Sequence, residues 1–246
     1  MVATASMRPE QPANPASPSA TRATGKFAWL LLAMALLPAW ARACGGHPEQ
    51  WRADIAAFAA ADRAHPPPPH PVLFVGSSSI RMWSTLAEDF PGRAVVNRGF
   101  GGSRIPDATH YARRLVAPYH PRAIVLYSVD NDLAEGCTPR HVRNALAAFV
   151  RRARALDPGV PIAFIAVKPS MARKHLLPQI RHANALVRDY AGRHGVAYLD
   201  VFTPMLGPDG QPQPQWFGPD GLHMNREGYA LWTRVVRAWL DAMVHP

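Results

Sequence analysis

Apolar runs alternate with amphipathic segments over most of this chain. The clearest run lies at 72–76, where four apolar residues follow one another and end at Gly76. A run of this kind is typical of a strand that is covered on both faces, as in a parallel sheet. Similar runs predict four further strands, at 93–97, 123–128, 161–167 and 196–200.

Segments with apolar residues at helical spacing lie between these strands and around them. Trp51, Ile55 and Phe58 share one face of a helix predicted over 50–63, and the prolines at 66–69 end it. The same spacing predicts helices at 79–88, 105–116, 139–156, 178–193 and 226–243. Strands that alternate with helices indicate βαβ units. Right-handed crossovers then favour a three-layer α/β/α sandwich over residues 48–246, with a five-stranded parallel sheet in the order 2-1-3-4-5.

The composition of the chain is different before residue 44. Residues 1–21 are rich in Pro, Ala, Ser and Thr, and we expect no folded structure there. A basic segment leads into eleven apolar residues at 27–37, a run too short to span a membrane and typical of a signal peptide. We therefore expect a disordered leader and signal peptide over 1–43, cleavage near Ala43, and a single exported domain over 44–246, periplasmic or secreted. Met7 offers an alternative start.

Cys44 and Cys137 are the two cysteines of the chain. An oxidising compartment would permit a disulfide between them, although two cysteines define no framework and the sequence does not show that they meet. Cys44 directly follows the predicted cleavage position, so it also allows a lipid anchor. Because Ala41 stands where a lipobox usually has leucine, the anchor is the less favoured alternative.

The chain carries a formal net charge of +10, and three of its 27 basic residues are lysines. A basic surface could attract nucleic acid or anionic lipid. However, no arginine-rich block is interleaved with aromatic residues, and the cluster at 151–154 is typical of the solvated face of a helix. We therefore expect no nucleic-acid partner, and no transmembrane span.

Distinctive polar residues follow three of the predicted strands and precede the last helix. Ser78 follows the first strand, Gly102 the second and Asn131 the third, and Asp220 and His223 lie before the helix at 226–243. Because loops at the carboxyl ends of parallel strands meet at one edge of a sheet, we expect these residues to lie together. A nucleophilic serine needs a base, an acid that orients the base, and donors for the oxyanion, and this set has a candidate for each role.

Each of these residues has a simpler interpretation when it is taken alone. Serines 77–79 could cap the following helix, because serine oxygens accept from the free N–H groups of a first turn. His223 could be a surface residue, and Gly102 and Asn131 could be ordinary turn residues. A zinc site is a poorer explanation, because no second histidine stands at the spacing of a zinc motif and the cysteines are too few.

Four blocks of the chain, in this order, resemble the SGNH or GDSL hydrolases, a family of serine esterases and acylhydrolases on a flavodoxin-like α/β/α sandwich. The blocks are 74–80, 97–102, 129–132 and 220–223, within a resemblance that covers about residues 70–243. It implies Ser78 as the nucleophile, with His223 as the base and Asp220 as the acid. It also implies an oxyanion hole formed by the backbone of Ser78 and Gly102 and by the side chain of Asn131.

Two positions depart from the pattern of that family. Ser77 replaces the aspartate of the GDSL motif, and since that aspartate is not the triad acid, we expect little effect on the mechanism. Val129 stands where the third block usually has glycine. Because a β-branched residue does not adopt a positive φ cheaply, we expect the backbone there to differ or to be strained, which affects the placement of Asn131.

The resemblance implies a carboxylic ester hydrolase that needs no cofactor and no metal. Its substrate would be a small-molecule or carbohydrate ester, such as an acetyl ester of a carbohydrate or a small lipid ester. The alternative from another class is an exported, non-catalytic module that binds glycan or lipid in the same cleft, with an oxyanion site spoiled at Val129. The loops that would define the substrate cannot be derived from the sequence.

Overall fold

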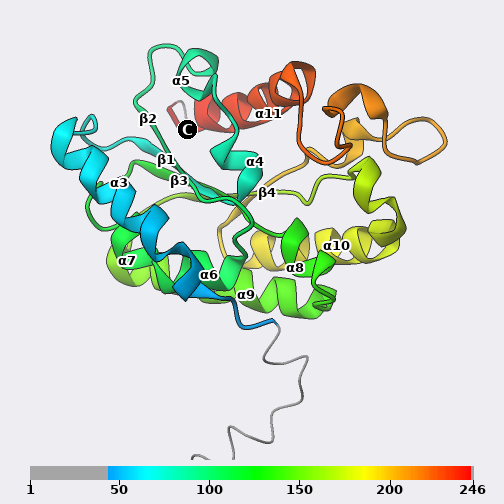
Figure 1. Ribbon diagram of the computed structural model, residues 1–246, viewed down its shortest axis with the longest axis horizontal. Helices are drawn as coiled ribbons and strands as arrows, with labels where there is room; N and C mark the ends of the chain where they lie inside the picture. Colours follow the sequence, from blue (N-terminus) through cyan, green and yellow to red (C-terminus); the bar gives the residue numbers. More distant parts are fainter. Residues whose placement is uncertain (1–43, 245–246) are drawn as a thin grey trace, which may run out of the picture. The chain divides into compact units, whose positions relative to one another are not determined.

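Five parallel strands form the centre of the structure, a computed structural model that describes residues 44–244 (Figure 1). The strands are β1 (Val72–Gly76), β2 (Val95–Gly99), β3 (Ala123–Tyr127), β4 (Ile162–Ile165) and β5 (Ala197–Leu199). Their order is β2-β1-β3-β4-β5 and every pair is parallel, so the predicted order is confirmed. The leader and the cleavage position predicted over 1–43 lie outside the described residues.

The register of the first three strands brings their carboxyl ends to one level. Gly76 at the end of β1 lies opposite Gly99 of β2 and opposite Tyr127 of β3. The loops that follow these strands therefore start side by side, at the edge where ligands bind in open α/β sheets. β1 and β3 are buried along their whole length, as expected of strands that are covered on both faces.

Helices cover both faces of the sheet and produce the predicted three layers. On one side lie α4 (Ser78–Arg81), α5 (Leu86–Asp89) and α11 (Arg226–Val244), and on the other lie α6 (Ile105–His110), α7 (Ala112–Leu115), α9 (Pro139–Leu156) and α10 (Leu177–Arg193) (Figure 1). The shorter or peripheral elements are η1 (Pro48–Trp51), α3 (Arg52–Ala64), α8 (Asp130–Ala134), η2 (Met171–Leu176), η3 (Thr203–Met205) and η4 (Pro214–Trp216). None of the helices within 44–244 is long and apolar enough to cross a membrane.

Two of the predicted helices are interrupted. The helix predicted at 79–88 is divided into α4 and α5, because the chain turns at Trp83 and buries its indole among the aromatic rings of the core. The Trp83 Nε1 donates to Asp89 Oδ2 at 2.7 Å, which satisfies the polar atom of the indole. The helix predicted at 105–116 is divided at Tyr111 into α6 and α7. The remaining elements differ from the prediction by a few residues at their ends.

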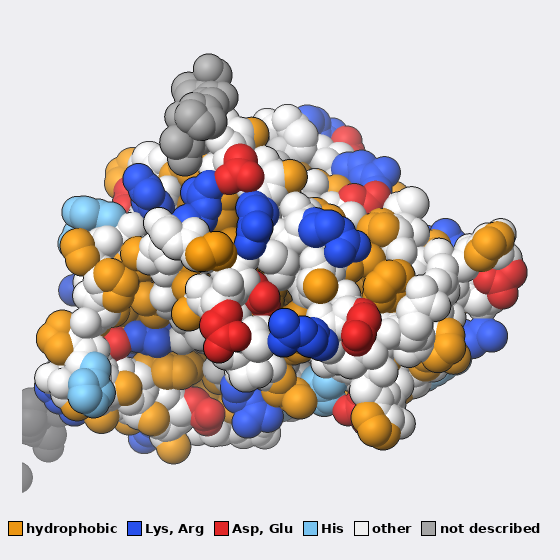
Figure 2. Space-filling model, turned by 90° about the horizontal axis from the view of Figure 1, so that it is seen from above, with side chains coloured by type: hydrophobic (Ala, Val, Ile, Leu, Met, Phe, Trp, Pro, Cys, Tyr) orange, Lys and Arg blue, Asp and Glu red, His pale blue; other side chains and the backbone are white. Residues whose placement is uncertain are grey.

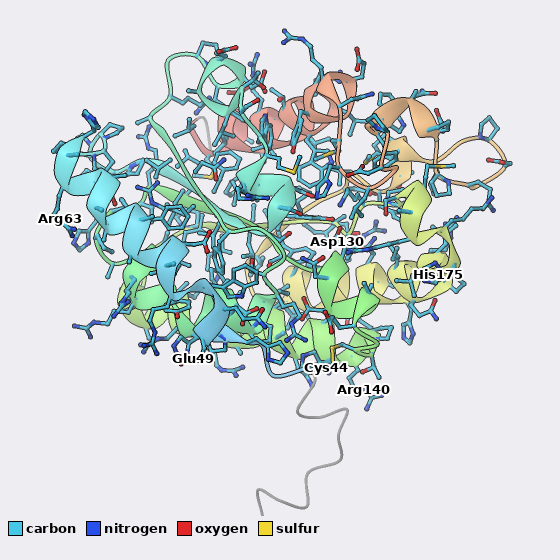
Figure 3. All side chains as sticks on the ribbon, in the orientation of Figure 1. Cys44, Glu49, Arg63, Asp130, Arg140 and His175 are labelled. Carbon is cyan, nitrogen blue, oxygen red and sulfur yellow. A yellow bond between two sulfur atoms is a disulfide. The ribbon has the colours of Figure 1, made fainter. Side chains whose placement is uncertain are left out.

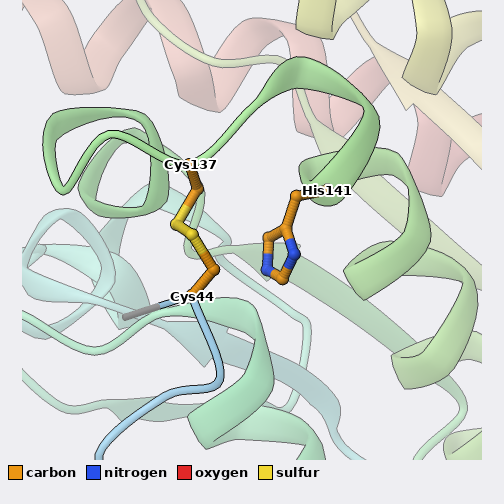
Figure 4. Close-up of side chains that lie close together, drawn as sticks. All are labelled: Cys44, Cys137 and His141. Atoms are coloured by element: carbon orange, nitrogen blue, oxygen red, sulfur yellow. A yellow bond between two sulfur atoms is a disulfide. The ribbon is translucent and has the colours of Figure 1, made fainter. Parts of the chain in front are cut away.

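Cys44 and Cys137 form a disulfide that ties the start of the described chain to the turn between α8 and α9 (Figure 4). Their Cα atoms are 5.7 Å apart, and 93 positions separate them in the sequence. This contact answers the question of pairing that the sequence left open. A lipid anchor would use the same sulfur atom of Cys44, so the disulfide and the anchor exclude each other within one molecule.

Charged side chains of both signs are mixed on the face that Figure 2 shows from above. This is the side on which α5 and α11 lie in Figure 1. Among the ion pairs of these elements, Arg93 contacts Asp241 of α11. A mixed face of this kind differs from the continuous basic surface by which proteins bind nucleic acid.

Candidate active site

Ser78 is the first residue of α4 and directly follows the turn at the carboxyl end of β1. The turn is held by Ser77, whose backbone N–H donates to the carbonyl of Tyr127 at 3.0 Å. The Ser77 carbonyl in turn accepts from the N–H groups of Ile80 and Arg81, each at 3.0 Å. The strand-to-helix turn therefore leaves the Ser78 side chain partly exposed at the edge of the sheet.

The serines of this turn do not act as helix caps. Ser77 occupies the N-cap position of α4, but its side chain makes no capping hydrogen bond. The Ser77 Oγ is buried and has no hydrogen-bond partner within the described part of the chain. The simpler interpretation of these serines as caps is therefore wrong for Ser77.

His223 connects Ser78 to Asp220. Its Nε2 lies 2.9 Å from the Ser78 Oγ, and its Nδ1 lies 2.5 Å from the Asp220 Oδ2. Because an ionised carboxylate only accepts hydrogen bonds, Nδ1 carries the ring proton and Nε2 is left to accept from the serine hydroxyl. The structure thus brings these three predicted residues into one chain of hydrogen bonds.

The loop around Asp220 also fixes the charge of its carboxylate. The Oδ1 accepts from the backbone N–H groups of Leu222 and His223, each at 2.9 Å. The hydrogen bond from Leu222 and the contact with the His223 ring lower the pKa of Asp220 to about 2. A carboxylate that remains ionised is able to orient a neutral imidazole and to stabilise the imidazolium when it forms.

Gly102 and Asn131 are both next to Ser103, Gly102 in the sequence and Asn131 through a hydrogen bond. Asn131 lies in the first turn of α8, and its Nδ2 donates to the Ser103 carbonyl at 3.0 Å. Gly102 has a φ of +84°, and an added Cβ would lie 3.2 Å from the indole of Trp51. Both the left-handed backbone and this close approach favour glycine.

Three N–H donors near this edge are free to meet a ligand. The backbone N–H groups of Ser78 and Gly102 have no acceptor among residues 44–244. The Asn131 amide carries two N–H groups, and Ser103 is the one acceptor that it has among these residues. Unpaired donors at the edge of a site are what an anionic oxygen requires.

Val129 does not show the strain that its side chain suggested. Its φ is −121° and its ψ is −33°, so the position does not adopt the left-handed backbone that glycine would favour. The Val129 side chain is buried, and α8 begins at the next residue. Of the two expected outcomes, a different backbone or a strained one, the structure has a backbone that differs from the left-handed conformation that glycine permits.

The sequence analysis missed two cations beside the site, Lys168 and Arg173. Lys168 follows β4 and is 1% exposed, and Arg173 lies in η2. One signal for Lys168 was present in the sequence, since a lysine directly after a buried strand is unusual in a chain whose basic residues are nearly all arginine. Nothing in the sequence distinguished Arg173 from the other arginines of the chain.

One group of residues with metal-ligating side chains occurs among the described residues. Cys44, Cys137 and His141 offer ligand atoms within 4.8 Å of one another (Figure 4). The two sulfur atoms are joined in a disulfide, so they are not thiolate ligands in this structure. Burial lowers the pKa of His141, and a hydrogen bond to the backbone of Cys44 opposes that shift.

Residues 74–231 match the family model of the GDSL-like lipase/acylhydrolase family. The match covers more than half of the chain, and it includes Ser78, Gly102, Asn131, Asp220 and His223. The chain belongs to the GDSL-like lipase/acylhydrolase family. Membership of this family supports a hydrolase function and confirms the resemblance on which the predicted site residues depend.

Solved structures share the fold of this GDSL-like hydrolase. A GDSL-like lipase from Bacteroides thetaiotaomicron is 21% identical, with a TM-score of 0.68 over 78% of this chain and 98% of that one. A member of the lipolytic protein G-D-S-L family from Veillonella parvula is 17% identical, with a TM-score of 0.58 over 72% and 99%. A lipase/acylhydrolase from Enterococcus faecalis is 16% identical, with a TM-score of 0.55 over 70% and 96%. No curated protein sequence matches the chain.

Proposed function

We propose that this GDSL-like hydrolase is a serine esterase that removes an acyl group from a carboxylic ester. The observation that carries the proposal is the position of His223, which lies between the hydroxyl of Ser78 and the carboxylate of Asp220 at hydrogen-bond distance from each. A serine, a base and an acid in this order are the arrangement that activates a hydroxyl for attack on a carbonyl.

In the first half of the reaction, the Ser78 Oγ attacks the carbonyl carbon of the ester while the His223 Nε2 takes its proton. The carbonyl π electrons move to the oxygen and form a tetrahedral oxyanion. When the carbonyl re-forms, the bond to the alcohol breaks, and the imidazolium returns the proton to the departing oxygen. The product of this half is an acyl group on Ser78, with the free alcohol released.

Water completes the reaction by the same steps. His223 takes a proton from water, the resulting hydroxide attacks the acyl carbon, and the second tetrahedral intermediate expels the Ser78 oxygen. The proton on the imidazolium passes to that oxygen, so the serine hydroxyl is restored and a carboxylic acid leaves. Asp220 remains ionised throughout and stabilises each imidazolium.

The free N–H groups of Ser78, Gly102 and Asn131 would hold the oxyanion in both halves. Donors that are already in place stabilise the charge as it develops, without the cost of reorganising them. Val129 does not adopt the left-handed backbone whose strain would spoil this arrangement, since its φ is −121°. That finding supports an enzyme over the alternative of a non-catalytic glycan- or lipid-binding module.

We propose a small-molecule or carbohydrate ester as the substrate, with an acetyl ester of a carbohydrate or a small lipid ester as the first compounds to test. A series of p-nitrophenyl esters of increasing acyl length would give the preferred chain, and acetylated sugars would test the alcohol side. Labelling by an organophosphate, followed by peptide mass spectrometry, should place the adduct on Ser78. A folded protein that neither turns over these esters nor becomes labelled would instead favour the binding module.

We also propose that the protein is exported and cleaved near Ala43. The disulfide between Cys44 and Cys137 supports this proposal, because disulfides persist in oxidising compartments. Mass spectrometry of protein from each cell fraction would identify the mature N-terminus. A mass that corresponds to a diacylglyceryl group on Cys44 would show that this residue carries a lipid anchor and not the disulfide. An uncleaved cytoplasmic protein would contradict export.

A further inference from the structure

An ion cluster of Asp130, Lys168 and Arg173 lies next to the proposed oxyanion site, with Asp130 and Lys168 buried and Arg173 partly buried. The Lys168 Nζ donates to the Asp130 Oδ2 at 2.6 Å, and the Arg173 Nη1 lies 3.0 Å from the same oxygen. The Arg173 contact lacks the geometry of a hydrogen bond and is an ion pair. Figure 3 shows Asp130 toward the middle of the structure, whereas Arg63 and Arg140 lie at its periphery. No step of the proposed mechanism uses this cluster.

Lys168 connects the cluster to the turn that carries the nucleophile. Its Nζ also donates to the Ser79 Oγ at 3.2 Å and to the Tyr127 hydroxyl at 3.1 Å. The Ser79 carbonyl accepts from the hydroxyl of Tyr229 in α11 at 3.0 Å. Ser79 is thereby held at its side chain and at its backbone, and it is the immediate neighbour of Ser78.

Arg173 connects the cluster to the proposed oxyanion donor. Its Nη2 donates to the Asn131 Oδ1 at 2.9 Å, while the Asn131 Nδ2 donates to Ser103 on the other side. A guanidinium group only donates, so it must face the oxygen of the amide and not the nitrogen. The contacts with Arg173 and with the Ser103 carbonyl, which only accepts, therefore favour the same orientation of the Asn131 amide.

We propose that Arg173 is a positioning residue that holds the Asn131 amide with its N–H groups toward the reacting ester, and that Asp130, itself held by Lys168, keeps Arg173 in place. This inference rests on the proposed function of the same site. Without Arg173, the hydrogen bond to Ser103 would be left to oppose rotation of the amide, and a rotated amide would present its carbonyl oxygen to the oxyanion and repel it. The cluster thus links the nucleophile turn and the oxyanion donor through buried and partly buried side chains.

The charges of the cluster keep Asp130 ionised and strengthen the donor of Asn131. Burial alone would raise the pKa of Asp130, but Lys168 and Arg173 outweigh it and lower the pKa below its ordinary value. Asp130 is therefore ionised, and two cations face one carboxylate. A hydrogen bond from a cation also polarises the amide, which makes the remaining N–H of Asn131 a stronger donor.

A double-mutant cycle of Arg173 and Asn131 tests this inference. Asn131→Ala should lower kcat by roughly 100- to 1,000-fold, the usual cost of losing one oxyanion donor. Arg173→Met should lower kcat by about 10- to 100-fold with little change in KM, because it leaves the donor present but no longer oriented. In the Asn131→Ala background, the same change should cost less than about threefold, since residues that act through one another are not additive.

Two further variants separate positioning from a purely structural role. Arg173→Lys keeps a cation beside Asp130 but lacks the planar fork, so it should restore thermal stability more fully than it restores kcat. Arg188→Met removes an arginine of α10 that pairs with Asp200 at 3.2 Å, and it should leave kcat unchanged. Equal losses of kcat from Arg173→Met with and without Asn131 would overturn the inference. A wild-type protein without esterase activity or Ser78 labelling would overturn the proposed function instead.

Discussion

The imidazole of His223 is held by a carboxylate at one nitrogen and meets a hydroxyl at the other. The sequence predicted the pairing with Asp220, as the acid that would orient this base. It did not predict the contact of Arg173 with Asn131. Those two side chains come from separate loops, and the pattern of residues along one segment carries no information about which loops pack together.

Loss of either Ser78 or His223 should remove nearly all turnover. Each residue depends on the other for the attack, so Ser78→Ala and His223→Ala should each lower kcat by a factor on the order of 10⁶, with the double variant no worse. Steady-state kinetics on a short-chain p-nitrophenyl ester would measure this. Ser77→Ala is the matched control, because its Oγ has no partner within the described residues. If Ser77→Ala abolished activity and Ser78→Ala did not, the nucleophile would be misassigned.

Asp220 should keep its negative charge at neutral and mildly acidic pH. Its pKa of about 2 lies below the ordinary value for aspartate, so its contribution to stability is fully present above the ordinary pKa and is lost progressively as the pH falls from there through about 2. Protonation of Asp220 should therefore not account for any loss of kcat/KM at mildly acidic pH. In the Asp220→Asn variant, kcat/KM should be lower at every pH, and any decrease toward acidic pH should remain as an acidic limb of the profile. Disappearance of the limb would mean that Asp220 itself titrates there.

At the scale of elements, the close approach of β1 and β3 depends on a residue without a side chain. A Cβ on Gly76 would lie 1.9 Å from the carbonyl oxygen of Tyr127. The sequence located this strand and its end correctly, since a continuous apolar run followed by glycine and serine predicts a buried strand and a turn. It did not locate the break at Trp83, because the helical spacing continues through a residue whose indole is drawn into the core.

Gly76→Ala should therefore destabilise the sheet at the strand that carries the nucleophile. The clash is with backbone, which cannot rotate away, so we expect a loss of about 1–3 kcal/mol or more in the free energy of unfolding. Urea denaturation followed by circular dichroism would measure it. Gly159→Ala is the matched control, because an added Cβ meets nothing within 4 Å and its φ is not positive, so it should be neutral or slightly stabilising. Equal stability of both variants would contradict the packing described for β1.

At the scale of the whole molecule, the order of the five strands followed from the alternation of strands and helices and from the handedness of their crossovers. The disulfide did not follow from the sequence. Cys44 lies ahead of η1 and Cys137 follows β3 and α8, so their contact depends on how the ends of separate elements are placed.

Removal of the disulfide should lower stability without changing the chemistry. A bond across 93 positions restricts the unfolded chain, and loss of such a bond typically costs about 2–5 kcal/mol. The Cys44→Ser, Cys137→Ser double variant should unfold at lower urea concentration and keep its kcat at temperatures where it remains folded. Addition of reductant should shift the wild-type transition toward that of the variant. An unchanged transition on reduction would show that the bond does not stabilise the fold.

The same bond divides the site residues into two groups. Ser78, Gly102 and Asn131 lie inside the covalent ring that it closes, and Asp220 and His223 lie outside. A protease that cut once inside the ring between Ser78 and Gly102, for example at the exposed turn of Pro91 and Gly92, would produce two fragments that sulfur still joins. The nicked protein would migrate as one species on a non-reducing gel and as two after reduction. The nucleophile and its oxyanion donors would thus stay on one molecule after a cut that severs the chain.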